Sequence, residues 1–230
     1  MFSKFWLILL CLGAQLVSCK ENNLESKHPF ARYFYPILDE PKIYVYRDVI
    51  GGLDEQFHRV YCVKDHKGKH LVVERYASDG RILEALNFNI DSLDVQDHMV
   101  VNRSQKKTKA ILYKTTYFPW NEAQQTWFAS KFEGVLDSTI ILQEIKRSLA
   151  NDKIEREVLG NMTSALSFTD STRFTLLNPF SKSEKILEEK STCFYAQGFG
   201  LVEWMGQNNK VHFKLEQIMS QEEWVKIMIR

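Results

Sequence analysis

The apolar residues between positions 41 and 118 fall into short runs rich in β-branched and aromatic side chains, and turn-forming residues separate these runs. Three successive runs, each followed by a short gap that contains glycine, occupy residues 43–46, 57–63 and 70–76. Gaps of this length and composition are typical of hairpin connections, so the pattern predicts consecutive antiparallel strands. The meander is expected to continue through residues 81–89, 98–103 and 109–118.

The run at residues 57–63 carries apolar side chains on both faces of the predicted strand. Phe57 and Tyr61 fall on one face, and Val60 and Cys62 fall on the other. A strand of a sheet with one solvated face would alternate apolar and polar residues instead. We therefore expect both faces of the sheet to be at least partly covered.

The middle of the chain departs from this pattern. Asn121 is a suitable N-cap, and Trp127, Phe128 and Phe132 lie near helical spacing, so a helix is predicted over residues 121–132. Residues 136–149 are ambiguous, because their apolar residues recur every four positions while several are β-branched. We favour a strand there, then a turn at Asn151-Asp152-Lys153 and a second strand over residues 154–158.

The strongest strand signal lies near the C-terminus. Val211, Phe213 and Leu215 alternate strictly with polar residues, which predicts that these three side chains face a core. We expect residues 201–205 to pair with residues 211–215 across a turn. Ser220-Gln221-Glu222-Glu223 has the spacing of a capping box and opens either a short final helix or a frayed tail.

Composition supports one globular domain. The 230 residues are 44% hydrophobic and 26% charged, with 10 Gly and 5 Pro, which is ordinary for globular proteins. No repeat and no Ser/Gly/Pro-rich linker divides residues 29–230, which we assign to a single β-rich domain. The predicted fold class is mainly β, a curved antiparallel meander of hairpins with one or two short helices. The formal net charge of +1 gives no electrostatic basis for nucleic acid as a partner.

The first 18 residues have the organisation of a signal peptide. Lys4 precedes an apolar run, Phe5 to Leu12, and polar character returns by Gln15. A permanent membrane-spanning helix needs about 20 apolar residues, which this run does not reach. Residues 1–18 are therefore assigned as a cleaved signal peptide.

Leu16-Val17-Ser18-Cys19 resembles the lipobox of bacterial lipoproteins. The resemblance implies that the Cys19 thiol receives a diacylglyceryl group and that the freed amine of Cys19 is then acylated. Two or three acyl chains anchor a protein stably, whereas one chain binds marginally. The alternative is an ordinary secretory signal peptide cut near Ser18 or Cys19, with Cys19 incidental.

Residues 19–28 are polar and are assigned as a lipidated tether. Lys20 follows the lipidated cysteine, and the resemblance to the bacterial sorting rule then favours the outer over the inner membrane. The expected location is therefore the cell envelope, with the acyl chains at the N-terminus as the contact with the membrane.

Tyr195-Ala196-Gln197-Gly198-Phe199-Gly200-Leu201-Val202 resembles a closing motif of uncharacterised, β-rich envelope lipoproteins and periplasmic proteins of Gram-negative bacteria. The match covers about ten residues, and Phe199 replaces the usual Val. The resemblance implies a curved antiparallel sheet that ends here. It implies no chemistry and assigns no specific family.

Local catalytic and cofactor motifs each lack a required element. Gly198-Phe199-Gly200 has no third glycine and no helix after it, so two glycines at a bulge or a close backbone crossing explain it better than a dinucleotide site. His66 and His70 flank a glycine-containing turn and do not share a helical face. Asp91, Asp94 and Asp97 form a solvated acidic loop, without the alternating ligands of a Ca²⁺ site. We predict no catalytic residue, no metal site and no cofactor.

Two cysteines remain after Cys19, and both lie in apolar strands. In an oxidising envelope, Cys62 and Cys193 are a candidate disulfide pair, but buried free thiols fit the same positions. A catalytic cysteine is the least favoured of the three readings.

Two functional hypotheses follow. The first is a lipid-anchored envelope protein that acts as a non-enzymatic binding or structural module, for an apolar ligand or an envelope partner. The alternative is an envelope hydrolase whose site is assembled from residues distant in sequence. A concave pocket would distinguish them, because convergent His, Asp or Glu groups favour catalysis and an apolar lining favours lipid or hydrophobic peptide.

Overall fold

The computed structural model describes residues 26–66, 68–102, 104, 106–134, 139–208 and 210–228. The predicted signal peptide and Cys19 lie outside these residues. The elements are η1 (Ala31–Tyr33), β1 (Lys42–Asp48), β2 (Gln56–Asp65), β3 (Gly68–Tyr76), β4 (Ile82–Asn89), β5 (Val95–Val101), β6 (Lys107–Lys109), β7 (Ile111–Thr115), β8 (Thr126–Glu133), β9 (Ile140–Val158), β10 (Asn161–Asn178), β11 (Ser183–Ala196), β12 (Gly200–Gly206), β13 (His212–Ser220) and α1 (Gln221–Met228).

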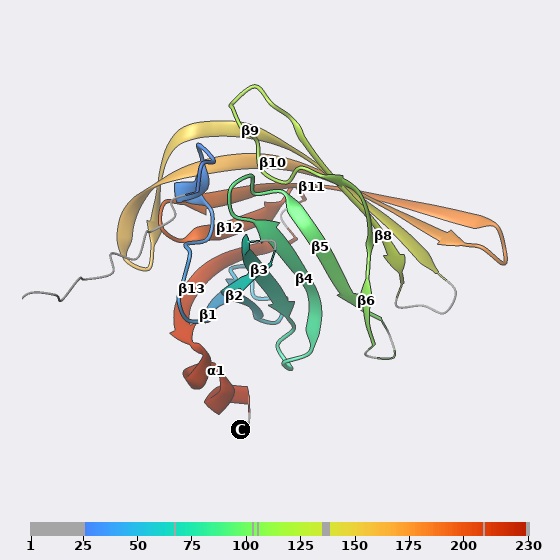
Figure 1. The fold of residues 1–230 in the computed structure, drawn as a ribbon, viewed down its shortest axis with the longest axis horizontal. Helices are drawn as coiled ribbons and strands as arrows, with labels where there is room; N and C mark the ends of the chain where they lie inside the picture. The colour runs from blue at the N-terminus through green and yellow to red at the C-terminus, as the bar shows by residue number, and fades with distance from the viewer. Residues whose placement is uncertain are drawn as a thin grey trace, which may run out of the picture.

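All 13 strands belong to one antiparallel sheet in the order β6-β5-β4-β3-β2-β1-β13-β12-β11-β10-β9-β8-β7. Strands that are consecutive in sequence are neighbours in the sheet, except β6 and β7, which form its two edges, and β1 also pairs with β13. The predicted fold class, a curved antiparallel meander with short helices, is confirmed. Figure 1 shows β9, β10 and β11 arching over the other strands, and the β10–β11 hairpin projecting beyond them.

The sheet curls until its two edges meet in one chain segment. β6 pairs with β5 and β7 pairs with β8, yet only Ala110 separates β6 from β7. The amide of Ala110 donates to the carbonyl oxygen of His98 at 2.8 Å, which holds this junction against β5. The concave face of the sheet therefore encloses most of the core.

The N-terminal segment fills part of this concave face. Tyr33, Phe34 and Tyr35 are buried in the main core, and the amide of Gly198 donates to the carbonyl oxygen of Arg32. Within the predicted tether, His28 is buried and its ring lies 4.6 Å from that of Trp120. The packed part of the chain thus includes the last residues of the segment expected to be a tether.

The two glycines of the closing motif have a structural role. Both adopt positive φ, and a Cβ at Gly200 would lie 2.5 Å from Cδ1 of Tyr35. A side chain at position 200 would therefore displace the aromatic segment from the core. This confirms the close backbone crossing expected from Gly198-Phe199-Gly200.

A smaller apolar cluster covers part of the outer face of the sheet. This agrees with the prediction, made from the apolar residues on both faces of residues 57–63, that both faces are partly covered. Phe57 packs there with Ile43, Val45 and Met219, and Trp224 of α1 lies against them. The capping box forms as predicted: the Ser220 amide donates to Glu223 Oε2 at 2.8 Å, and the Glu223 amide donates to Ser220 Oγ at 3.2 Å. No helix among the described residues has both the length and the apolar character needed to cross a membrane.

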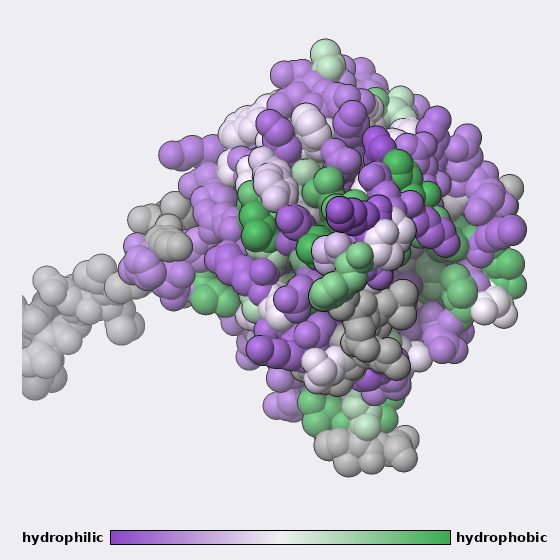
Figure 2. All heavy atoms as spheres, turned by 90° about the vertical axis from the view of Figure 1, so that its right-hand side faces the viewer, coloured by the Kyte–Doolittle hydropathy of each residue, from purple (hydrophilic) through white to green (hydrophobic). Residues whose placement is uncertain are grey.

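Figure 2 shows polar residues interspersed with apolar ones over the side of the molecule toward which the β10–β11 hairpin projects. A group of apolar residues lies at the bottom of this view, at the level of α1. Val225 and Ile227 of α1 are exposed apolar residues.

The C-terminal hairpin is also confirmed. Trp204 pairs with Phe213 and Glu203 pairs with Lys214, while the Gly206 amide closes the turn on the carbonyl oxygen of Val211 at 2.9 Å. Phe213 and Leu215 are buried and Lys214 is exposed, as the alternation required.

Two predictions for the middle of the chain are wrong. The helix expected over residues 121–132 is a turn followed by β8, because the Asn121 side chain accepts a hydrogen bond from the Ala123 amide and Phe128 pairs with Ile145 of β9. The turn expected at Asn151-Asp152-Lys153 is an irregularity inside β9, where the register with β10 shifts. The strand itself, favoured over residues 136–149, is present from Ile140 and continues to Val158.

Candidate functional site

A cavity of about 160 Å³ lies within the concave face of the sheet. Its aromatic lining comes from Phe34, Tyr35, Phe88, Tyr117, Tyr195 and Trp204. Its polar lining comes from His58, Arg75, Glu84, Arg147, Asp170 and Cys193. The lining is therefore mixed: titratable groups converge on the cavity, and it is not the apolar lining that a lipid or hydrophobic peptide would require.

Three of the polar residues are direct cross-strand neighbours. His58 on β2 pairs with Arg75 on β3, and Arg75 pairs with Glu84 on β4, so the three side chains form one row on the concave face. Arg75 Nη1 donates to Glu84 Oε1 at 2.6 Å. Burial alone would raise the pKa of Glu84, but the charge of Arg75 and the hydrogen bond from His98 outweigh it and lower the pKa to about 2. Glu84 is therefore a carboxylate at neutral pH.

His58 is oriented by a chain of tyrosine hydroxyls. His58 Nδ1 lies 3.1 Å from Tyr35 Oη, which lies 3.2 Å from Tyr46 Oη, and the Tyr46 hydroxyl donates to the carbonyl oxygen of Leu201 at 2.8 Å. The Tyr46 hydroxyl donates its proton to Leu201, so towards Tyr35 it can only accept. The Tyr35 hydroxyl therefore donates to Tyr46 Oη and accepts a hydrogen bond from Nδ1–H of His58. In this arrangement Nε2 of His58 carries a lone pair.

The same environment keeps His58 neutral. Burial, together with the charge of Arg75, lowers the pKa of His58 well below its ordinary value. The imidazole is only 4% exposed and stacks on Trp204 with ring centroids 5.9 Å apart. His58 is thus a fixed hydrogen-bond acceptor in the cavity wall.

Two buried nitrogens of the cavity wall have no hydrogen-bond partner in the part of the chain that the structure describes. These are Nε2 of His58 and Nε of Arg75. The Arg75 side chain nevertheless keeps 40% of its surface accessible, so a solvent-sized molecule reaches this residue. The residues of the cavity wall therefore include one unpaired acceptor and one unpaired donor, on the adjacent strands β2 and β3.

The opposite wall holds a second ion pair. Arg147 Nε and Nη2 donate to the two carboxylate oxygens of Asp170 at 2.8 and 2.7 Å, and the guanidinium lies 4.5 Å above the ring of Tyr117. The Cys193 thiol donates to Asp170 Oδ2 at 3.4 Å. Burial and the charge of Asp170 raise the pKa of this thiol, so it stays protonated and is a poor nucleophile.

The candidate disulfide is not formed. Cys62 and Cys193 are both free thiols in the structure, on strands β2 and β11, which are separated in the sheet by β1, β13 and β12. The two cysteines are therefore free thiols in apolar strands, which was the alternative to a disulfide.

A serine, a histidine and a glutamate are hydrogen-bonded in series where the two edges of the sheet meet. His98 Nδ1 lies 3.0 Å from Ser130 Oγ, and His98 Nε2 lies 3.2 Å from Glu84 Oε2. Since Glu84 is ionised, Nε2–H donates to it and Nδ1 accepts from the Ser130 hydroxyl. Ser130 and His98 have no exposed surface, and the rings of Phe128 and Phe132 lie within 6 Å of the imidazole. The series joins β4, β5 and β8 and holds the curled sheet closed.

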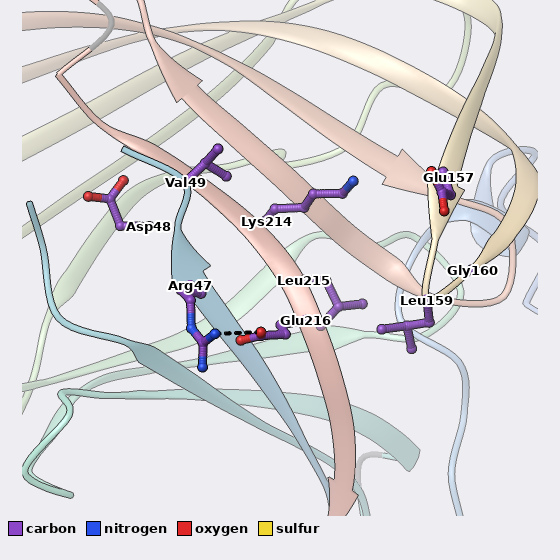
Figure 3. Close-up of a pocket in the computed structure, with 9 residues that line it drawn as sticks. All are labelled: Arg47, Asp48, Val49, Glu157, Leu159, Gly160, Lys214, Leu215 and Glu216. Carbon is purple, nitrogen blue, oxygen red and sulfur yellow. Dashed lines mark ion pairs between the residues drawn. The ribbon is translucent and has the colours of Figure 1, made fainter. Parts of the chain in front are cut away.

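An outer groove of about 400 Å³ lies between β1, β13 and the β9–β10 turn. Figure 3 shows Arg47 paired with Glu216 along it, at 2.7 Å. Asp48 accepts hydrogen bonds from the amides of Gly52 and Leu53 in the following loop. The inner cavity is the stronger candidate site, because its lining residues, unlike those of this groove, include buried nitrogens without a hydrogen-bond partner among the described residues.

Among the candidate site residues named from the sequence, Cys193 lines the cavity, as do Tyr195 and Leu201 of the closing motif. His70 is buried and lies 2.9 Å from Asp65, outside the cavity lining. The described residues contain no group of three His, Cys, Asp or Glu side chains arranged to hold a metal ion. His58, Arg75, Glu84, Arg147 and Asp170 were missed. The first four are polar residues within predicted strands, whereas no strand was predicted around Asp170, which lies in β10.

No protein-family model and no curated protein matches the chain. Among solved structures, the fold is similar to a candidate lipoprotein from Parabacteroides distasonis, at 11% identity over 81% of this chain and 98% of that one, with a TM-score of 0.48. It is also similar to a candidate exported protein with a YmcC-like fold from Bacteroides fragilis, at 12% identity over 81% and 99%, with a TM-score of 0.41. At these values neither likeness carries an argument about what this chain does.

Proposed function

We propose that the chain is a lipid-anchored protein of the bacterial cell envelope, most consistent with the outer membrane, and that Cys19 carries the acyl chains. The support is the lipobox Leu16-Val17-Ser18-Cys19 after a short apolar run. Cys19→Ser should release the protein from the membrane fraction or block its processing. Mass spectrometry that finds an unmodified N-terminus on the wild-type mature protein would refute the anchor.

We further propose that the protein acts by binding a small ligand in the inner cavity, and not by catalysis. The observation that supports this proposal is the pair of unpartnered nitrogens, His58 Nε2 and Arg75 Nε, in two residues that line the cavity. Buried polar atoms are nearly always hydrogen-bonded, so a ligand that satisfies both gains binding energy that the apo protein forgoes.

A thermal-shift screen of the full chain against small molecules tests this binding role. A ligand present at 100 times its Kd stabilises a protein by about 2.7 kcal/mol, which raises Tm measurably. Leu86→Trp should abolish the shift, because Leu86 lines the cavity and the larger side chain fills it. A shift that survives Leu86→Trp would place the ligand elsewhere.

The alternative, a hydrolase, is favoured by two observations. His, Asp and Glu side chains converge on the cavity, and Ser130, His98 and Glu84 have the connectivity of a catalytic triad. A fluorophosphonate probe tests it directly. Labelling of wild-type protein that Ser130→Ala abolishes would establish a reactive serine. We expect no labelling, because the Ser130 hydroxyl is buried between apolar strands and a substrate carbonyl has no path to it.

A further inference from the structure

The charges in the cavity wall are balanced. Arg75 is paired with Glu84 at 2.6 Å, and Arg147 is paired with Asp170 at 2.7 Å. An anionic ligand would therefore meet two carboxylates as well as two guanidinium groups. Burying a charge without a dedicated counter-ion is costly, so this wall selects against an ionised ligand.

The free hydrogen-bonding capacity is one acceptor and one donor on adjacent strands. His58 and Arg75 are directly opposed in the register, which places their Cβ atoms about 4.5–5.5 Å apart. An ionised carboxylate offers no proton to His58 Nε2, and an alkyl chain satisfies neither nitrogen. A hydroxyl group both donates and accepts, and two hydroxyl groups on neighbouring carbons satisfy both nitrogens together.

Size and lining narrow the ligand further. Sites for drug-sized ligands occupy about 300–1,000 Å³, so a cavity of about 160 Å³ has room for one ring and not for a long acyl chain. Tyr35, Phe88 and Tyr117 contribute apolar ring surface to the lining, against which the C–H groups of a ligand ring can pack.

We infer that the cavity takes a neutral, polyhydroxylated compound the size of a single ring. One ligand hydroxyl donates to His58 Nε2, and a neighbouring ligand oxygen accepts from Arg75 Nε–H. This inference rests on the proposed binding role and specifies the chemistry of its ligand.

The test compares three single-ring probes by NMR of the full chain in detergent. myo-Inositol is neutral and polyhydroxylated, quinate is polyhydroxylated but carries a carboxylate, and cyclohexanol has one hydroxyl. The ¹⁵N resonance of His58 Nε2 reports occupancy of the cavity. We expect myo-inositol to shift this resonance and to bind at least about tenfold more tightly than either of the other probes.

Variants separate the hydrogen bonds from the fold. His58→Phe removes the acceptor, and Arg75→Lys removes Nε–H while it keeps a cation beside Glu84. Each should weaken myo-inositol binding about tenfold. His70→Phe is the matched control, because His70 is equally buried but lies outside the cavity, and it should leave the affinity unchanged. If His58→Phe fails to fold, Arg75→Lys still decides the matter.

The outcomes distinguish the ligand class from the binding role. Tighter binding of quinate or cyclohexanol, with a shift of His58, would overturn the polyhydroxylated class and leave the cavity as a binding site. If none of the three probes shifts His58, both the ligand class and the proposed role fail. Equal affinity of the wild type and Arg75→Lys would also overturn the inferred contacts.

Discussion

Removal of Arg147 tests whether the inner ion pair is as buried as the structure shows. The Arg147 and Asp170 side chains are 2% and 7% exposed and share two charge-assisted hydrogen bonds. Arg147→Met keeps the length of the side chain but leaves the Asp170 carboxylate without its cation. Asp170→Leu leaves the guanidinium unpaired in the same way.

The expected magnitudes follow from burial. Breaking one side of a buried ion pair costs about 3–5 kcal/mol, whereas replacing both partners by apolar residues is often close to neutral. Each single variant should therefore lose about 3–5 kcal/mol of unfolding free energy. The double variant should lie within about 2 kcal/mol of the wild type, so the coupling energy reaches about 4 kcal/mol or more.

Urea unfolding followed by far-UV circular dichroism and tryptophan fluorescence gives these free energies by linear extrapolation. The four proteins form a double-mutant cycle measured under one set of conditions. A cost below about 1 kcal/mol for Arg147→Met would show that solvent screens the pair. Additive costs in the double variant would show that the two side chains do not interact as described.

Three further predictions concern the core, the response to acid and the final helix. Phe213→Ala should lower the free energy of unfolding in urea by about 3–5 kcal/mol, because the ring is 1% exposed and stacks on Trp204. Lys214→Ala, at the exposed neighbouring position, should change it by no more than about 0.5 kcal/mol. Equal losses would mean that the faces of the strand are assigned wrongly. Burial lowers the pKa of His28 to about 4, so on acidification the unfolded chain binds a proton near pH 6.5 and the folded chain binds it only near pH 4. The free energy of unfolding should therefore fall by about 3 kcal/mol as the pH decreases across this window. His28→Phe should flatten this part of the stability-versus-pH curve, and an unchanged curve would show that His28 titrates normally. Ser220→Ala should cost about 1 kcal/mol and speed amide exchange in α1 alone, whereas unchanged exchange there would show that the capping box does not hold the helix.

The regular parts of the fold are readable from side-chain alternation. Val211, Phe213 and Leu215 alternate with polar residues, and no helical face would place all three on one side, so the strand and its hairpin partner could be predicted, although not the exact register. Ser220 and Glu223 likewise satisfy each other within one turn. In both cases the determinants are local in sequence.

The errors arise where long-range pairing decides between local alternatives. The run from Trp127 to Phe132 fits one face of a helix as well as a strand, and pairing with β9 on one side and β7 on the other selects the strand. At residues 151–153 a strong turn signal produced only a register shift, because β10 continues alongside and supplies partners on both sides of it.

The candidate site was not predictable for the same reason. His58, Arg75 and Glu84 are separated by 17 and then 9 positions, and only the register of β2, β3 and β4 places them in one row. The available signal was a polar residue at a position where alternation calls for an apolar one, as His58 is in the set shared with Val60 and Cys62. That signal marks buried polar groups, but it does not say which of them meet.

The protonation state of His58 tests the central claim most directly. Long-range ¹H–¹⁵N correlation spectra of the full chain at neutral pH distinguish the two neutral tautomers from the imidazolium. The account predicts a neutral His58 with the proton on Nδ1, shared with Tyr35, and an unprotonated Nε2 that has no partner among the described residues. A proton on Nε2, or a cationic ring, would mean that the cavity wall offers no acceptor and would contradict the account.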